Sequence, residues 1–315
     1  METMRAIVQH SFGGPEVLEL DERPLPEPIA TEVRVRVQAA GVNPVDWKTR
    51  SGKGAVAQFG TPLTVGWDVC GVVDAVGPGV TRFAVGDPVF GMPWFPRLGR
   101  AYAEYVTAPS RQFARIPEGL DTVQAGGLPL AGLTAWQALV DTAGVTRGDR
   151  VLIHAAAGGV GHLAVQIAKS RGAHIIATAR ANKHDFLRGL GVEQIIDYTD
   201  VAFEAEAGEV DVVLDLVGTE DYGMRSLQTL RDGGLLIQVP SSAPESVKHA
   251  GRDQGKRVTG ILVEPDGHAL EQLAALAGNG ALRVEVAEEL PLEQAARAHT
   301  LGEEGRVQGK LVLVP

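Results

Sequence analysis

A succession of apolar strands and helices between residues 150 and 263 most strongly restricts the folds open to this 315-residue chain. Strands that are apolar along their whole length are typical of parallel sheets, because helices cover both faces of such sheets. The alternation therefore predicts an α/β fold with a doubly wound parallel sheet. The six predicted strands are Arg150–Ala155, His174–Ala179, Gln194–Tyr198, Asp211–Val217, Leu235–Val239 and Val258–Val263.

A glycine-rich turn follows the first of these strands. The segment His154–Gly161 reads HAAAGGVG, and a helix is predicted over Gly161–Arg171. Small residues let the backbone approach a pyrophosphate, and the start of a helix offers N–H groups and a positive dipole. Ala156 replaces the first glycine of the G-x-G-x-x-G pattern, so the strand and helix carry the prediction, and a turn chosen only for packing is the alternative. The predicted cofactor contacts in this turn are Ala157, Gly158, Gly159, Val160 and Gly161.

The end of the second predicted strand distinguishes between two dinucleotides. An NAD site usually places an acidic residue there for the ribose 2′-hydroxyl. Residues 177–184 contain no carboxylate, and the first one is Asp185. Arg180 and Lys183 could instead pair with a 2′-phosphate through charge-assisted hydrogen bonds. The sequence therefore predicts NADPH, and two solvated cations at a helix start are the alternative.

The segments on either side of the parallel sheet have another pattern. Residues 1–125 predict short strands separated by glycine and proline turns, and Glu32–Gln38 alternates between apolar and polar residues. A helical segment over residues 122–144 follows. The predicted domains are residues 1–125, 126–265 and 266–315, and the last two elements could pack back on the first domain. The other predicted elements are strands Arg5–Gln9, Val33–Gln38, Val69–Val76, Ala101–Val106, Leu282–Ala287 and Lys310–Val314, and helices His184–Leu190, Asp221–Leu230, 267–277 and 292–301.

Composition argues against several classes of protein. The formal net charge is −10 and no long basic run occurs, which disfavours binding to nucleic acid or to an anionic membrane. The single cysteine, Cys70, excludes an intrachain disulfide and a cysteine-cluster metal site. No secretory pattern opens the sequence and no stretch reaches 18 apolar residues, so a cytoplasmic location is expected.

Several segments together resemble the zinc-free quinone oxidoreductases, the zeta-crystallin-like branch of the medium-chain dehydrogenase/reductase superfamily. They are Gly41–Lys48 (GVNPVDWK), Gly66–Val73 (GWDVCGVV), Gly132–Trp136 (GLTAW), His154–Gly161 and Gly305–Val314 (GRVQGKLVLV). The resemblance covers essentially the whole chain. It implies a GroES-like catalytic domain formed by both chain ends, an inserted Rossmann domain that binds NADPH, and a homodimer or homotetramer assembled through the edge strand Val258–Val263.

The resemblance also implies site residues. Asn43 matches a residue on the nicotinamide side of the cleft, Thr134 a threonine beside the nicotinamide, and Tyr198 a tyrosine near the adenosine ribose phosphate. A tyrosine is common at the position of Lys48, so this lysine is a departure that could donate to an oxyanion or contact a cofactor phosphate. Asp46 is expected to orient Lys48 or Arg50; a turn or cap residue is the alternative.

Further site residues follow from the position of the predicted strands and loops. Ligands bind at the carboxyl ends of strands in such sheets, which makes Val239, Pro240, Ser241 and Val263 candidate cofactor contacts. Trp47, Trp67 and Trp94 are candidate substrate contacts, with core packing the stronger alternative for Trp67. The loop Met92–Arg100, which is rich in aromatic residues and proline, is a candidate substrate lid.

No metal is expected. Zinc-dependent relatives carry a cysteine near the position of Asn43 and a Gly-His-Glu motif at Gly66, where this chain has Gly66-Trp67-Asp68. A zinc site needs three or four converging ligands. The predicted chemistry is therefore metal-free hydride transfer from NADPH to a quinone, with stabilisation of the resulting oxyanion by the protein. An NADPH-dependent enone or enoyl reductase is the first alternative, and a non-catalytic NADPH-binding sensor or RNA-binding protein is the second.

Overall fold

The computed structural model describes residues 2–53, 60–239 and 243–315, and divides the chain into two compact units. Unit 1 combines Met1–Leu133 with Glu264–Pro315, and unit 2 is Thr134–Val263. Pro240 and Ser241, both predicted to contact the cofactor, lie outside the described residues. Each unit has its own sheet and is described by itself.

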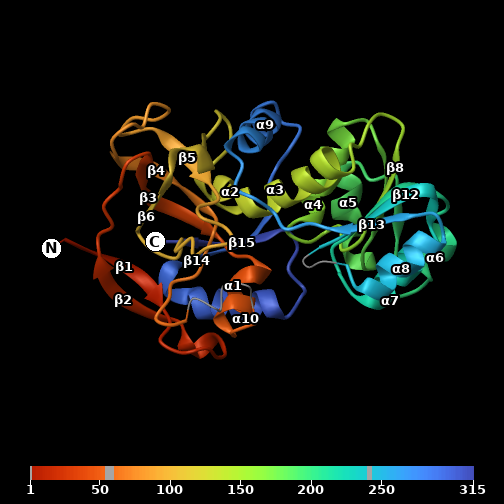
Figure 1. The fold of residues 1–315 in the computed structure, drawn as a ribbon, viewed down its shortest axis with the longest axis horizontal. Helices are drawn as coiled ribbons and strands as arrows, with labels where there is room; N and C mark the ends of the chain where they lie inside the picture. Colours follow the sequence, from red (N-terminus) through yellow and green to blue (C-terminus); the bar gives the residue numbers. More distant parts are fainter. Residues whose placement is uncertain (1, 54–59, 240–242) are drawn as a thin grey trace. The chain divides into compact units, whose positions relative to one another are not determined.

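Unit 2 contains a six-stranded parallel sheet in the order β10-β9-β8-β11-β12-β13. Its strands β8, β12 and β13 are labelled in Figure 1. The order reverses between β8 and β11, which lie side by side although two strands separate them in the sequence. This is the strand order of a dinucleotide-binding doubly wound sheet, so the predicted fold is confirmed. The strands are β8 (Arg150–Ile153), β9 (His174–Thr178), β10 (Gln194–Ile196), β11 (Val210–Asp215), β12 (Leu230–Gln238) and β13 (Arg257–Gly260).

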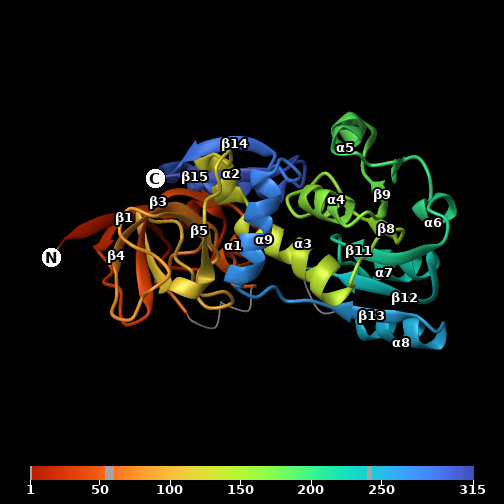
Figure 2. The same cartoon turned by 90° about the horizontal axis from the view of Figure 1, so that it is seen from above.

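Helices cover this sheet on both faces. Helix α4 packs against β8 and β9, and α7 packs against β11 and β12. Because right-handed crossovers run in opposite directions from β8, these two helices lie on opposite faces. Figure 2 shows β9, β8, β11, β12 and β13 in succession. The helices are α4 (Gly161–Ser170), α5 (His184–Leu190), α6 (Phe203–Glu206), α7 (Glu220–Leu227) and α8 (Glu245–Asp253), and a π-helical turn spans Gln137–Thr142.

Unit 1 is built on a largely antiparallel sheet in the order β14-β15-β3-β4-β5-β7, with β6 paired to β3 and a separate β1-β2 hairpin. The C-terminal strand β15 pairs with β3 from the N-terminal part, which confirms that the chain end returns to the first domain. The strands are β1 (Thr3–Val8), β2 (Glu19–Pro24), β3 (Glu32–Gly41), β4 (Val69–Val76), β5 (Pro88–Gly91), β6 (Tyr105–Pro109), β7 (Phe113–Arg115), β14 (Val286–Pro291) and β15 (Lys310–Val314).

Alternating valines explain the core of unit 1. Val33, Val35 and Val37 on β3 are buried, and they pack with residues of β4, β6 and α10. Burying each such side chain contributes about 1.5–3 kcal/mol relative to leaving it exposed. The longer helices of this unit are α1 (Pro44–Arg50), α2 (Thr122–Gly127), α3 (Pro129–Trp136, which continues into unit 2), α9 (Gly267–Gly278) and α10 (Ala295–Glu303).

Several predicted elements differ from the structure. Strand β12 begins at Leu230, five residues before its predicted start, and β13 ends at Gly260, three residues before its predicted end. The segment 122–144 is not one helix, because Pro129 lacks the amide hydrogen that would continue α2 and instead begins α3. Strand β6 begins four residues later than predicted, at Tyr105. Strand β14 begins at Val286, since Leu282 and Val284 are buried in an irregular segment and mimic the alternation of a strand.

The division into units also differs in detail from the predicted domains. The predicted boundary at residues 125 and 126 would cut α2, which packs on β3 and β4. Among the described residues, no helix has the length and apolar character needed to cross a bilayer.

Candidate functional site

The turn between β8 and α4 has the tight backbone that a pyrophosphate requires. Ala155 is left-handed, with φ of 49°, and a side chain added at Gly161 would collide with the carbonyl oxygen of Ala155. At Gly158, an added Cβ would have only that same oxygen within 4 Å, at 3.2 Å, so its outer side is open. The turn thus presents small residues and a helix start, and fits a dinucleotide phosphate.

Two buried histidines, His154 and His162, form hydrogen bonds in and beside this turn. The carbonyl of Gly158 only accepts, so Nδ1 of His162 donates to it at 2.8 Å. His154 lies between the hydroxyls of Thr178 and Ser226, at 3.0 Å from each, and burial lowers its pKa to about 3. His154 is thus a neutral structural residue, although it stands inside the motif that predicts the site.

The end of β9 presents the two cations that the sequence predicts. Arg180 is exposed and its Nε donates to the Tyr198 hydroxyl at 3.1 Å, so two predicted cofactor residues do meet. Lys183 is half-buried in the following turn. Asp197 is the nearby acid, and its Oδ2 accepts from the backbone N–H of Ala181 at 2.8 Å. In the described part of the chain, neither cation forms an ion pair with a carboxylate.

The other described residues that the sequence predicts to contact the cofactor include Thr134, Val239 and Val263. Thr134 and Val263 are buried, and β13 ends at Gly260. The Val239 N–H donates to the carbonyl of Asp215 at 2.8 Å. Sequence analysis missed the Asp215 side chain, which accepts from the backbone N–H groups of Val217 and Gly218 and from Gln238 at the carboxyl edge of the sheet.

In unit 1, the candidate residues gather around the start of α1. The N-terminal cap of this helix is Asn43, with Pro44 at its first position. The Asn43 N–H donates to Asp46 Oδ2 at 2.6 Å, which closes a capping box. Asn43 and Asp46 are thereby placed together, but both are buried and both are used in fixing the helix.

The side chain of Asn43 is held by a buried ion pair of Asp68 and Lys310. Its Nδ2 donates to Asp68 Oδ2 at 2.8 Å, and its Oδ1 accepts from the Lys310 ammonium. Lys310 also donates to the carbonyl of Val42 at 2.9 Å and lies 3.4 Å from Asp68 Oδ2. Burial raises the pKa of Asp68, and Lys310 opposes that effect. Asp68 lies in the segment Gly66–Val73 and Lys310 in the segment Gly305–Val314, both of which carry the family resemblance. Because 242 residues separate them, no local sequence pattern could predict that they pair.

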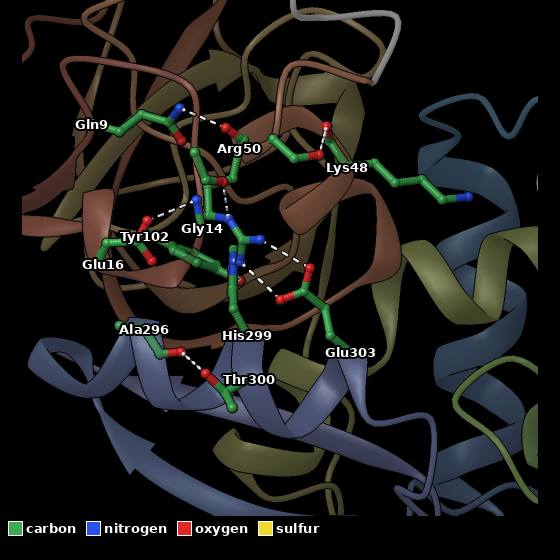
Figure 3. A network of polar contacts seen from close by, with 12 residues as sticks. Gln9, Gly14, Glu16, Lys48, Arg50, Tyr102, Ala296, His299, Thr300 and Glu303 are labelled. Carbon is green, nitrogen blue, oxygen red and sulfur yellow. Dashed lines mark hydrogen bonds and ion pairs between the residues drawn. The ribbon is translucent and has the colours of Figure 1, made fainter.

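A second buried network connects Asp46 with α10. Figure 3 shows the part of it around Arg50, His299 and Glu303. Arg50 donates to Nδ1 of His299 at 3.1 Å and forms two bonds with Glu303, at 2.9 and 3.2 Å. A guanidinium only donates, so Nε2 of His299 carries the ring proton and donates to the Tyr102 oxygen at 3.2 Å. The Tyr102 hydroxyl then donates to Asp46 Oδ2 at 2.9 Å. Burial and Arg50 lower the pKa of His299 to about 3, which keeps it neutral.

These contacts favour the alternative role of Asp46 as a cap residue. Its bonded oxygen serves Asn43 and Tyr102, and Arg50 pairs with Glu303, so Asp46 orients neither Lys48 nor Arg50. Asp46 is fully buried, and its bonds fix the start of α1. Lys48 is exposed and points away from the network (Figure 3). Partial burial of its ammonium lowers the pKa of Lys48.

The three tryptophans have different environments. Trp67 is fully buried, and its Nε1 donates to the Arg97 carbonyl at 2.6 Å, which favours the core-packing alternative. Trp47 is half-buried against His299 of α10, with 6.1 Å between ring centroids. Trp94 lines a pocket that includes none of the residues on α1.

Replacing Asp46 with asparagine is expected to remove a pH-dependent loss of stability. Burial raises the pKa of Asp46 from 3.8 to about 7 in the fold. The unfolded chain releases this proton near pH 4, so the carboxyl lowers stability as pH rises from about 4 to about 7. The amide oxygen can accept both bonds of Oδ2, and Oδ1 has no partner among the described residues.

Urea unfolding between pH 5 and 8 measures this effect. The free energy of unfolding of Asp46→Asn, relative to the parent, should increase with pH by at most about 1.4 kcal/mol per unit and level off above pH 7. A difference that stays constant over this range would contradict the assignment.

The residues present do not fit a catalytic metal. In the described ranges, no group of three or more His, Cys, Asp or Glu side chains is placed to hold an ion. The ammonium of Lys310 fills the space beside Asn43 and Asp68. Cys70 is buried, which raises the pKa of its thiol well above its usual range and disfavours a thiolate ligand.

Comparison with known proteins gives matches along most of the chain. Residues 29–118 match the alcohol dehydrogenase GroES-like domain, and residues 190–313 match the family described as zinc-binding dehydrogenase. The zinc in that description is not supported by a ligand set in the described residues.

Individual relatives are more specific. A quinone oxidoreductase of Sus scrofa is 34% identical, over 94% of this chain and 93% of its own. An NADPH-dependent alkenal/one oxidoreductase of Arabidopsis thaliana is 31% identical, over 99% of this chain and 80% of its own. The structure of the quinone oxidoreductase from Coxiella burnetii has 40% identity and a TM-score of 0.94, and the match covers both chains completely. The chain therefore belongs to the quinone oxidoreductase family of the medium-chain dehydrogenase/reductase superfamily, and is a nicotinamide-dinucleotide-dependent oxidoreductase.

Proposed function

We propose that this protein is an NADPH-dependent quinone reductase that works without a metal. The observation that carries the choice of cofactor is the pair of cations at the end of β9, Arg180 and Lys183, where an acidic residue would favour NAD. The similarity to quinone oxidoreductases supports the class of acceptor. The β8–α4 turn would hold the pyrophosphate, and Tyr198 would steady Arg180 beside the 2′-phosphate.

When bound, the nicotinamide dinucleotide supplies a hydride equivalent to the acceptor. The protein must then stabilise negative charge on the acceptor oxygen and provide a proton to it. Lys48 is the candidate donor, because its ammonium carries protons and partial burial lowers its pKa. Asn43 and Asp46 act by fixing the start of α1, on which Lys48 stands two residues after Asp46.

Reduction of an enone is the second candidate function. It is favoured by the similarity to the Arabidopsis thaliana alkenal/one oxidoreductase. Both reactions place negative charge on an acceptor oxygen, so Lys48 would serve either reaction.

The edge of the sheet at β13 is the proposed contact for a homodimer or homotetramer, because this strand is the last in its sheet.

A panel of acceptors separates these functions. NADPH oxidation would be followed with 1,4-benzoquinone, 9,10-phenanthrenequinone, a short enone and a 2-enoyl thioester, with NADH in parallel. Turnover of the quinones is the expected result. Selective turnover of the enone or the thioester would move the assignment to double-bond reduction. Binding of NADPH without turnover of any acceptor would favour a non-catalytic protein.

Replacing Lys48 with alanine is expected to lower kcat about 10²-fold or more, the range for loss of a positioned proton donor. The KM for NADPH should change little, since the interaction develops only with the oxyanion. Steady-state kinetics with 9,10-phenanthrenequinone checks this. Lys53→Ala, an exposed lysine five residues along the chain, is the matched control. Equal kinetics for both variants and the parent would return Lys48 to an ordinary surface role.

A further inference from the structure

A pocket in unit 1 lies outside the candidate active site. It is bounded by the β1-β2 hairpin, the segment 62–64, the loop 94–100 and strand β6, and its volume is about 560 Å³. Such a volume is in the range of sites for small organic ligands. Its described lining residues include neither Asn43, Asp46 nor Lys48. We propose that this pocket is a binding site for an aromatic organic anion, a carboxylate or a sulfonate.

The pocket has an excess of positively charged side chains. Three arginines line the pocket, Arg23, Arg97 and Arg100, and no Asp or Glu is among its described lining residues. Arg97 and Arg100 are exposed, and neither guanidinium has an ion-pair partner within the described part of the chain. Arg23 is shared with Asp21, at 3.2 Å. In a chain whose net charge is −10, this local excess of positive charge is complementary to an anion.

Part of the remaining wall is apolar, and Thr64, Tyr105 and Thr107 add polar groups to it. Met4, Ala6 and Val8 from β1 pack with Ala103, and Leu63 also lines the pocket. Trp94 provides an indole ring against which a planar ligand could stack. An apolar wall, an aromatic ring and a guanidinium rim suit a ligand that is flat and apolar at one end and anionic at the other.

The loop that carries these groups is fixed before any ligand arrives. The Trp94 backbone N–H donates to Gln112 Oε1, and its indole Nε1 donates to the Thr107 carbonyl, both at 2.8 Å. The Arg97 N–H donates to the Trp94 carbonyl at 2.7 Å. Both donor groups of Trp94 are therefore occupied by the protein, which fixes the orientation of its ring.

Backbone strain marks the same loop. Trp94 and Arg100 have φ values of 62° and 59°, in the left-handed region that disfavours residues other than glycine. Such a backbone conformation persists only where surrounding contacts enforce it. The bonds from Ala101 N to the Gly66 carbonyl and from Tyr102 N to the Val65 carbonyl, both 3.1 Å, provide that enforcement. The strain places Trp94 and Arg100 at the pocket, and so adds to the case for a ligand.

Binding of 1-naphthalenesulfonate to the purified full chain tests the proposal. Fluorescence of the protein would be titrated at low salt with this probe, and with 1-naphthalenemethanol as an uncharged analogue. Saturable binding of the sulfonate, with much weaker binding of the alcohol, is expected. In Arg97→Ala/Arg100→Ala the affinity for the sulfonate should fall about tenfold or more. Equal affinities of the double variant and the parent would overturn the proposal.

Two controls locate the binding. Arg111→Ala removes an exposed arginine that does not line the pocket, and should leave the affinity unchanged. Saturation with NADPH should also leave it unchanged, because no predicted cofactor residue lines the pocket. Competition between NADPH and the sulfonate would place the probe in the cofactor site and reject the proposal. The proposal stands or falls independently of the acceptor panel, since it requires no turnover.

Discussion

Replacing Lys310 with methionine should destabilise the protein by about 3–5 kcal/mol, the range for breaking a buried ion pair by removal of one partner. The side chain of Lys310 is 3% exposed and that of Asp68 is fully buried. Methionine fills much of the same volume but leaves Asp68 as an uncompensated buried charge, and leaves the carbonyl of Val42 and Oδ1 of Asn43 without their donor. Urea unfolding at neutral pH measures the loss.

A double variant identifies the cause. Asp68→Asn in the Lys310→Met background removes the stranded charge, so part of the lost stability should return. The defect of Lys310→Met should also shrink at acidic pH, where Asp68 takes up a proton. Lys53→Met, at an exposed position, is the control and should be nearly neutral. A loss below about 1 kcal/mol for Lys310→Met would show that the ion pair does not hold α1 in place.

Replacing both Arg180 and Lys183 with alanine should weaken NADPH binding by about 10²-fold and NADH binding hardly at all. Hydrogen bonds to charged groups contribute about 1.5–3 kcal/mol each, and the 2′-phosphate is the group that NADH lacks. Isothermal titration with both cofactors measures the two dissociation constants. The change in their ratio is the quantity of interest, because a general disturbance of the unit would affect both.

The matched control for this variant is Arg188→Ala on α5. Arg188 is exposed and already paired with Asp185 at 2.7 Å. It should leave both dissociation constants unchanged. Equal weakening of NADPH and NADH in the double variant would remove the 2′-phosphate assignment, and with it the preference for NADPH.

Local patterns in the sequence predicted the elements that depend on nearby residues. Strands β8 and β9 follow from continuous apolar runs, and helix α4 follows from the HAAAGGVG turn, because those signals arise within a dozen residues. Strand β14 was misplaced since buried Leu282 and Val284 have the same alternation as a strand, and only pairing with β15 decides the register.

The site of unit 1 was less accessible to sequence reasoning. The sequence predicts Asn43 beside the nicotinamide, and Asp46 either as the residue that orients Lys48 or Arg50 or as a cap. In the structure both residues form the capping box at the start of α1. Their partners Asp68, Tyr102 and Lys310 come from distant parts of the chain, and a single sequence does not pair residues over such separations. Polar residues with a structural role and those with a catalytic role are alike in sequence, and burial distinguishes them.

A single-turnover experiment most directly tests the proposal that the protein transfers a hydride from NADPH to a quinone. The protein saturated with NADPH would be mixed rapidly with 1,4-benzoquinone, and the loss of the reduced-cofactor absorbance followed together with the formation of quinol. One quinol is expected for each NADPH consumed, at a rate that falls when the transferred hydrogen at C4 of the nicotinamide is replaced by deuterium. Two results would contradict hydride transfer from NADPH to a quinone. In the first, NADPH stays reduced with the quinone but reduces an enone. In the second, the quinone is reduced by NADH and not by NADPH.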